Sequence, residues 1–115
     1  MKIGDVYLVE IPAIGGHEQA GYRPAIIIQS EDRAKELPTV LIIPLTSKTK
    51  ATNFPFTLLI KPDQANKLSS LSVALVFQLR AIDKRRLKQK LGSLKNNDTM
   101  KIKQIIKTMM LLDKE

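Results

Sequence analysis

The chain has 115 residues, 43% of them hydrophobic and 26% charged, which is the composition of one folded globular domain rather than a disordered chain. It contains no cysteine, which excludes a disulfide scaffold, a thiol nucleophile, a zinc knuckle and an iron-sulfur site. Its 19 Lys and Arg outnumber 11 Asp and Glu, and the resulting net charge of +8 favours nucleic acid as a partner, with acidic protein segments and anionic membrane surfaces as alternatives.

No apolar run in the sequence approaches the roughly 20 residues that span a bilayer. The first residues also lack the basic segment and long apolar stretch of a secretory leader. We therefore expect a cytoplasmic protein in which residues 1–115 form a single domain.

Short apolar runs bounded by turn residues predict strands over the first four-fifths of the chain. The first run, Val6–Ile11, is rich in residues that favour strands and is ended by Pro12. The aliphatic runs Ala25–Gln29 and Val40–Leu45 are suited to strands buried on both faces, so we expect both to be central. Further strands are expected over Phe56–Ile60, Ser72–Ile82 and Gln89–Leu94.

The last segment changes its hydrophobic period. Apolar residues recur there at spacings of three and four beneath a row of lysines: Ile102, Ile105, Ile106, Met109, Met110 and Leu112. This pattern predicts an amphipathic helix, with Asn97 and Asp98 placed to cap its first amides. The predicted fold class is mainly β (α+β): a small, strongly curved barrel of five to seven strands with one C-terminal helix packed against it.

The segment between the first two strands, Gly15–Pro24, reads Gly-Gly-His-Glu-Gln-Ala-Gly-Tyr-Arg-Pro and combines glycines that permit tight turns with several polar side chains. Together with Gly4–Tyr7, the run Arg23–Ile28, Pro44–Ser47 and Gln78–Asp83, it resembles the MazF/PemK family of ribonuclease toxins in order and spacing. The resemblance covers nearly the whole chain, and the Gly-His-Glu-Gln loop joined to Arg-Pro is its most specific part.

The resemblance implies an SH3-like barrel that forms a homodimer, binds single-stranded RNA at the dimer interface and is silenced by an acidic antitoxin protein. The implied activity is a sequence-selective endoribonuclease that cuts mRNA without a metal or cofactor. RNA carries its own nucleophile, the 2′-hydroxyl, so the cut requires a proton acceptor, donors for the charged phosphorane and an acid for the leaving oxygen. The expected products are a cyclic phosphate and a 5′-hydroxyl.

Four residues are predicted to be catalytic. Arg23 is the candidate phosphate clamp, the alternative being an arginine simply exposed at a strand start. Thr46 offers a hydroxyl donor to a phosphate oxygen, although Thr-Ser is also a common turn pair. His17, the single histidine, is suited to act as base or acid near neutrality, with Glu18 as the alternative base and a solvated loop histidine as the competing interpretation.

A second set of residues is predicted to bind RNA: Gln19, Ser47, Phe56, Gln78 and Arg80. Gln19 either contacts bases or ties its loop down. Gln78 either binds RNA or is a buried structural amide, and the two interpretations are equally good from sequence alone.

One departure from the family bears on the mechanism. Family members often carry an acidic residue directly before this glutamine, and some carry an arginine two places earlier, where this chain has Phe77 and Leu75. A mechanism that relies on such a pair cannot operate here, so either Arg23 and Thr46 carry the chemistry with help from the loop or the activity is weakened. Phe77 either stacks on an unpaired base or belongs to the core.

The densest positive run is Lys84–Lys90, which suits phosphates or an acidic antitoxin tail but is also explained as a solvated basic surface. Two other functions compete with the nuclease. One is a non-catalytic toxin of the same fold, similar to an inhibitor that binds DNA gyrase. The other is a degenerate nucleic-acid-binding module that has lost turnover.

Overall fold

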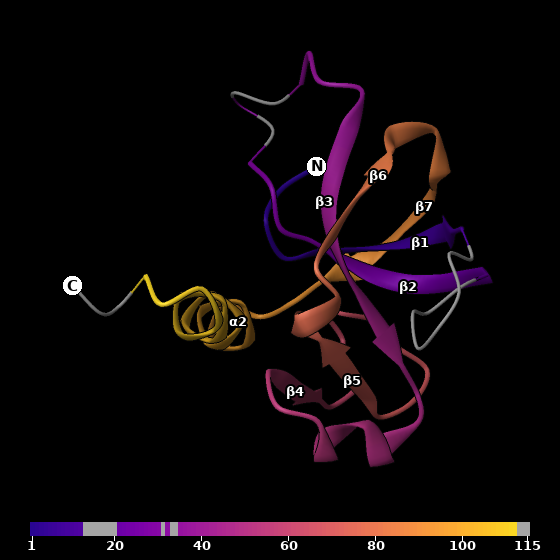
Figure 1. Ribbon diagram of the computed structural model, residues 1–115. Helices are drawn as coiled ribbons and strands as arrows, with labels where there is room; N and C mark the ends of the chain where they lie inside the picture. Colours follow the sequence, from indigo (N-terminus) through magenta and orange to yellow (C-terminus); the bar gives the residue numbers. More distant parts are fainter. Residues whose placement is uncertain (13–20, 31, 33–34, 113–115) are drawn as a thin grey trace.

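The computed structural model describes residues 1–12, 21–30, 32 and 35–112. In this part of the chain, seven antiparallel strands form one strongly curved sheet, and a C-terminal helix, α2 (Asn96–Met109), packs beside it (Figure 1). The strands run in the spatial order β4-β5-β3-β2-β1-β7, with β6 paired to β3. Their bounds are β1 (Asp5–Ile11), β2 (Gly21–Ile27), β3 (Thr39–Thr46), β4 (Thr57–Ile60), β5 (Ser72–Leu75), β6 (Arg80–Asp83) and β7 (Leu87–Ser93). The predicted mainly β fold with a terminal helix is confirmed.

Strands β2 and β3 lie in the middle of the sheet, and their segments Ala25–Ile27 and Ile42–Thr46 are buried on both faces, as their aliphatic composition predicts. Neighbouring residues along each strand point to opposite faces. Ile26 and Ile43 therefore belong to the cluster on the face that α2 covers. Ile27 and Ile42 belong to a separate cluster on the other face. Each central strand thus contributes side chains to both apolar layers.

Helix α2 closes the first of these layers. Ile102 is fully buried against the sheet, and Ile105, Ile106 and Met109 are partly buried around it. The predicted caps are wrong, because the helix begins at Asn96 and no side chain caps it. Asp98 is instead buried in the first turn, where a negative charge complements the helix dipole. Met110 and Leu112 lie beyond the helix and are exposed, so they do not extend its apolar face.

The predicted single strand over Ser72–Ile82 is wrong, because the segment is two strands separated by a 3-10 turn, η2 (Val76–Gln78). Strand β5 pairs with the end of β3, with Leu45 opposite Ala74. If that register continued, Ile42 would face Phe77, yet it faces Arg80, three residues later in the chain. The turn η2 takes up these three residues, and the alternating hydrophobic pattern of the segment does not reveal the shift.

Strand β2 begins at Gly21, four residues before the predicted start at Ala25. Proline was expected to precede the strand, but Pro24 lies within it, opposite Leu8 of β1. The pairing of β2 with β3 extends only over Ala25–Ile27, so Pro24 lies where the sheet has a neighbour on one side. A proline is tolerated at such an edge because no ladder hydrogen bond is needed there. Arg23 is consequently held by a strand rather than by a free loop.

Candidate active site

Arg23 and Thr46 lie two residues beyond the paired part of the two central strands. Ala25 of β2 lies opposite Pro44 of β3, and the same register continued by two residues places Arg23 opposite Thr46. Directly opposite residues of antiparallel strands carry their side chains on the same face of a sheet. At this point β3 turns away to pair with β5, and the strands open around a cavity of about 410 Å³ that both side chains line.

The hydroxyl of Thr46 is oriented by the backbone that follows it. Thr46 is only 3% exposed and lies opposite Val73 of β5. Its Oγ1 accepts a hydrogen bond of 3.2 Å from the backbone N–H of Lys48. Because the oxygen acts there as acceptor, the hydroxyl proton is left to donate elsewhere. The two interpretations from sequence are therefore compatible, since Thr46 forms a local turn and also offers a donor to the cavity.

A second cation, Lys67, lines the same cavity and was not identified from the sequence. It is held by a loop that buried Asn66 fixes. Asn66 Oδ1 accepts hydrogen bonds from the N–H groups of Asp63 and Leu68, and its Nδ2 donates to the Lys61 carbonyl oxygen. The Asp63-Gln64-Ala65-Asn66 run is a typical turn sequence, and it is the feature of the sequence from which this loop could have been predicted.

Strand β7 packs against the loop that carries Lys67. Gly92 lies so close to it that an added Cβ would stand 2.7 Å from the carbonyl oxygen of Asn66. The next residue, Ser93, donates its N–H to the carbonyl oxygen of Ala65 over 2.9 Å. The absence of a side chain at Gly92 therefore allows the loop to approach the sheet, and it fixes the wall of the cavity that carries Lys67.

The lining of this cavity is suited to an anion. Besides Arg23 and Lys67 it is formed by hydroxyl residues and apolar side chains: Tyr22, Pro24, Leu45, Thr46, Ser47, Leu68, Ser69, Ser70, Ser72 and Leu91. No acidic residue is among these described lining residues, so nothing in this set repels a phosphate. Within residues 1–12, 21–30, 32 and 35–112, no group of three or more His, Asp or Glu side chains is arranged to hold a metal ion. The chemistry offered is hydrogen-bond donation and positive charge.

A second cavity, of about 520 Å³, is also lined by Thr46 and is mainly apolar. It is lined by Thr46, Lys48, Lys50, Ala51, Asn53, Phe54, Leu75, Phe77 and Gln78. Phe77 is 37% exposed, so its interpretation as a core residue is wrong. Gln78 is half-buried in η2 rather than on a long strand.

The remaining predicted site residues are distributed differently. Ser47 is exposed and lines the cavity that contains Arg23. Phe56 and Arg80 line neither cavity. Arg80 is half-buried on β6, and its Nη1 is buried without a hydrogen-bond partner among the described residues. The predicted residues His17, Glu18 and Gln19 lie outside the described part of the chain.

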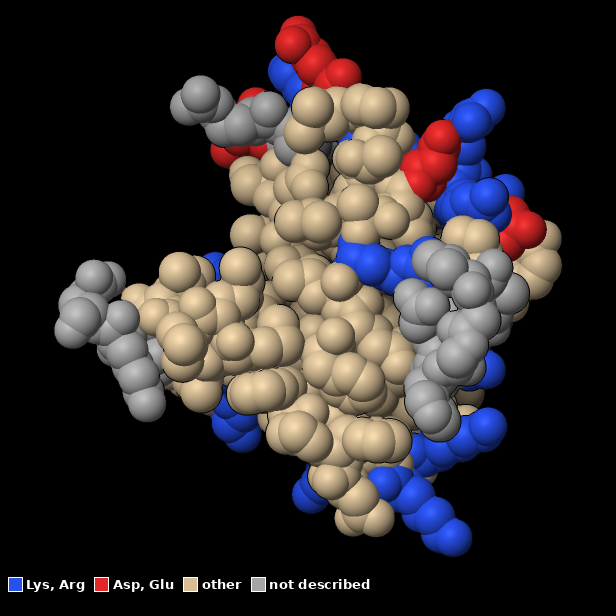
Figure 2. Space-filling model, in the orientation of Figure 1, with Lys and Arg blue, Asp and Glu red and all other residues tan. Residues whose placement is uncertain are grey.

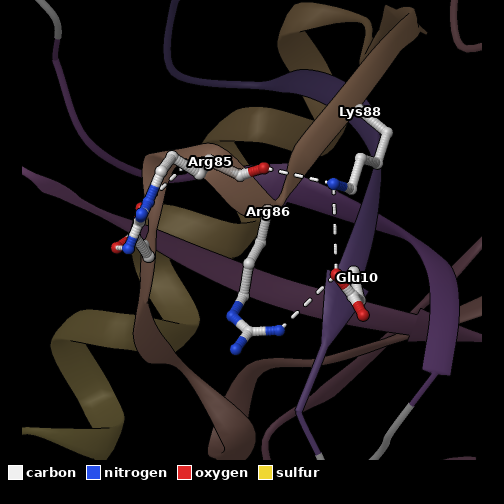
Figure 3. Close-up of polar contacts among 5 residues, drawn as sticks. Glu10, Arg85, Arg86 and Lys88 are labelled. Carbon is white, nitrogen blue, oxygen red and sulfur yellow. Dashed lines mark hydrogen bonds and ion pairs between the residues drawn. The ribbon is translucent and has the colours of Figure 1, made fainter.

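The basic run Lys84–Lys90 forms the turn η3 (Lys84–Arg86) and the start of β7, and acidic neighbours partly neutralise it. Arg86 Nη1 and Lys88 Nζ lie 3.6 and 4.0 Å from Glu10 Oε1 (Figure 3). Hydrogen bonds from the Arg85 side chain and N–H lower the pKa of Asp83 from 3.8 to about 2.

Positive side chains gather at two places on the face shown in Figure 2. One group lies over the turn between β6 and β7, where acidic side chains are mixed with it. The other lies at the end of the molecule that carries η1 (Thr49–Asn53), next to the apolar cavity that Lys48 and Lys50 line. The second group has no acidic residue among the described residues of that cavity, so its charge is the more available to an anion.

The described helices include none with the length and apolar character needed to cross a bilayer.

Comparisons with known proteins find relatives in sequence and in fold. Endoribonuclease MazF of Staphylococcus saprophyticus is 36% identical over 106 residues, which cover 92% of this chain and 88% of that protein. MazF from Deinococcus radiodurans has the same fold, with a TM-score of 0.80 at 22% identity over 96% of each chain. An endoribonuclease in complex with its cognate antitoxin from a mycobacterial species matches with a TM-score of 0.76 at 19% identity, over 97% of this chain and 96% of that one.

The family model for the PemK-like, MazF-like toxins of type II toxin-antitoxin systems matches residues 2–110. The match covers nearly the whole chain and includes every described residue of the two cavities. The chain belongs to this toxin family, as its sequence motifs predict.

Proposed function

We propose that this chain is the toxin of a type II toxin-antitoxin pair and cuts single-stranded RNA by attack of the ribose 2′-hydroxyl, without a metal. The observation that carries the proposal is that Arg23 of β2 and Thr46 of β3 line one cavity, without an acidic residue among its described lining. The 36% identical endoribonuclease supports the same activity.

Each described residue has a distinct part in the proposed reaction. The guanidinium of Arg23 donates paired hydrogen bonds to the non-bridging oxygens and stays charged as negative charge develops on them. The hydroxyl of Thr46 donates a further hydrogen bond, and Lys67 adds a positive charge to the lining of the same cavity. His17 remains the proposed base or acid, with Glu18 as the alternative base. Leu75 and Phe77 occupy the positions of the family's arginine and acid, so this reaction does not use that pair.

The proposal includes the partners and setting that the family implies. The toxin acts in the cytoplasm as a homodimer, cuts at selected sequences and is inhibited when an acidic antitoxin covers the RNA groove. The antitoxin complex of the similar mycobacterial endoribonuclease supports this part of the proposal. A small acidic protein encoded next to this gene is the expected inhibitor.

The activity is tested by incubating purified protein with a long single-stranded RNA in excess chelator and mapping the fragment ends. We expect cyclic-phosphate and 5′-hydroxyl ends, no cutting of single-stranded DNA, and loss of at least about 100-fold in rate for Arg23→Ala, because a donor to developing charge is removed. Lys103→Ala removes one positive charge from the exposed surface of α2 and is the matched control, with an expected rate close to wild type.

If the RNA stayed intact in this assay, the proposed nuclease activity would be rejected. Retained binding without cutting would identify the degenerate nucleic-acid-binding module. Loss of cutting in chelator with recovery on added Mg²⁺ would reject the metal-independent route. Equal rates for wild type and Arg23→Ala would remove Arg23 from the site.

A further inference from the structure

The three-residue register shift between β5 and β6 places an aromatic side chain on the surface. If the register of β5 with β3 continued, Phe77 would lie beside Ile42 in the sheet. The turn η2 directs Phe77 outward instead, and its side chain is 37% exposed. Its backbone N–H donates a hydrogen bond of 3.2 Å to the carbonyl oxygen of Phe56. Phe56 has a φ of 59°, a conformation that bulky residues rarely adopt. The position of Phe77 is therefore fixed by the backbone rather than by burial of its ring.

A second aromatic ring lies beside the first. The centroids of Phe54 and Phe77 are 5.4 Å apart with their planes inclined by 48°, and Phe54 is 53% exposed. Two fixed, partly exposed rings beside an apolar cavity provide surfaces on which a flat, unsaturated ring can stack. Buried Leu75 forms part of the apolar lining.

The charges around this cavity specify the kind of molecule that fits it. Lys48 and Lys50 are exposed and line the cavity together with the aromatic pair, and no acidic residue is among its described lining residues. An apolar peptide side chain or the apolar face of a second copy would gain nothing from two lysines. A nucleotide matches both features, because its base is flat and its phosphate is negative.

The aromatic cavity is also adjacent to the proposed active site, because Thr46 lines both cavities. We infer that the Phe54–Phe77 cavity is a base-stacking subsite, which holds one unpaired nucleobase of the RNA strand while the neighbouring phosphate lies against Arg23 and Thr46. The inference rests on the proposed function and adds the means by which the strand is positioned. In this chain, aromatic stacking at Phe77 stands where family members often carry a carboxylate.

The subsite is tested by fluorescence anisotropy at constant salt with 2′-O-methylated homo-oligomers, which cannot be cut by 2′-hydroxyl attack, and with an abasic strand of the same length. Phe77→Leu keeps an apolar side chain but removes the ring. We expect it to weaken binding of the best base-bearing oligomer by at least about fivefold, from the usual strength of base-aromatic stacking, and to leave abasic binding unchanged. Phe54→Ala should act in the same direction. Leu59→Ala, an exposed apolar residue of β4 outside both cavities, is the matched control.

Phe77→Trp provides a direct spectroscopic readout, because the natural chain has no tryptophan. We expect it to preserve affinity and its fluorescence to be quenched by base-bearing oligomers but not by the abasic strand. Melting temperatures of all variants should stay near wild type, since Phe77 is outside the core clusters.

If Phe77→Leu weakened the binding of base-bearing and abasic strands equally, the proposed subsite would be overturned. The same conclusion would follow if the wild-type protein bound none of the oligomers. A change of oligomeric state in Phe77→Leu or Phe54→Ala, measured by sedimentation, would also overturn it by making this face an interface between copies. If wild type cuts long RNA but Phe77→Leu weakens the binding of base-bearing and abasic strands equally, the base-stacking subsite is rejected and the proposed nuclease activity is retained. If base-dependent quenching occurs without any cutting, the nuclease fails and the subsite stands.

Discussion

The two cavities that meet at Thr46 differ in how the chain builds them. The cavity with Arg23 arises where one register, that of β2 with β3, runs out and its strands separate. The cavity with Phe77 arises where two registers on β3 disagree by three residues. The first collects cations and hydroxyls and the second collects aromatic rings. The end of one strand pairing thus gathers cationic and hydroxyl groups that are suited to a phosphate, whereas a shift of register exposes aromatic side chains that are suited to a base.

The comparison between the two cavities is tested most severely at Thr46, which lines both of them. Thr46→Val keeps the shape of the buried side chain and removes its hydroxyl. We expect the single-turnover cleavage rate to fall by about 10² to 10³, the usual effect of losing one donor to developing charge. Thr46→Ser retains the hydroxyl and should stay within about tenfold of wild type. A Thr46→Val rate equal to wild type would mean that the hydroxyl serves only its bond with Lys48.

The polar cavity alone should be disturbed by Asn66→Ala. The substitution removes three hydrogen bonds of a fully buried side chain, so we expect a loss of roughly 2 to 4 kcal/mol in the free energy of unfolding, measured with denaturant. Asn97→Ala, an exposed asparagine in α2, is the control and should change stability by less than about 0.5 kcal/mol. If both variants were equally stable, the loop that carries Lys67 would not depend on Asn66.

The contrast between phosphate and base recognition is sharpened by Lys67→Ala. We expect the slope of log affinity for single-stranded RNA against log salt to become shallower by about 0.7, the value for one phosphate contact on a single strand. Phe77→Leu should weaken binding without changing that slope, since stacking neutralises no phosphate. The same change of slope in both variants would show that the two cavities do not divide the recognition between them.

The turn between β6 and β7 lies outside both cavities and should give the smallest effect. The pKa of Asp83 is held at about 2 by Arg85, so the favourable interaction is complete above the ordinary value of 3.8 and is lost as pH falls from there toward 2. An NMR titration of the Asp83 carboxyl should show this pKa, and Arg85→Met should return it toward 3.8. An unchanged pKa in Arg85→Met would assign the shift to another neighbour.

The sequence predicts best those features that depend on local pattern. The aliphatic runs of β2 and β3 identify them as central strands, because only strands buried on both faces lack polar alternation. The Arg23 and Thr46 positions follow from motifs, and the structure brings both to one cavity. The roles of His17 and Glu18 stay predictions.

What the sequence could not predict depends on pairing between distant segments. The partly alternating apolar pattern of Ser72–Ile82 gives no sign that its two ends meet β3 in different registers. Lys67 and Phe54 approach the cavities through loops whose positions are set by Asn66 and by η1. Their side chains are ordinary surface residues in sequence, and their importance is visible only in three dimensions.

Strand β3 pairs with β2 and β6 along its first part and with β5 at its end, so it belongs to every layer of the fold. Local opening of either half must break hydrogen bonds on this one strand. The protein should therefore lack a small, independently melting subdomain. Backbone amides on both sides of β3 should exchange with solvent only through a shared, near-global opening.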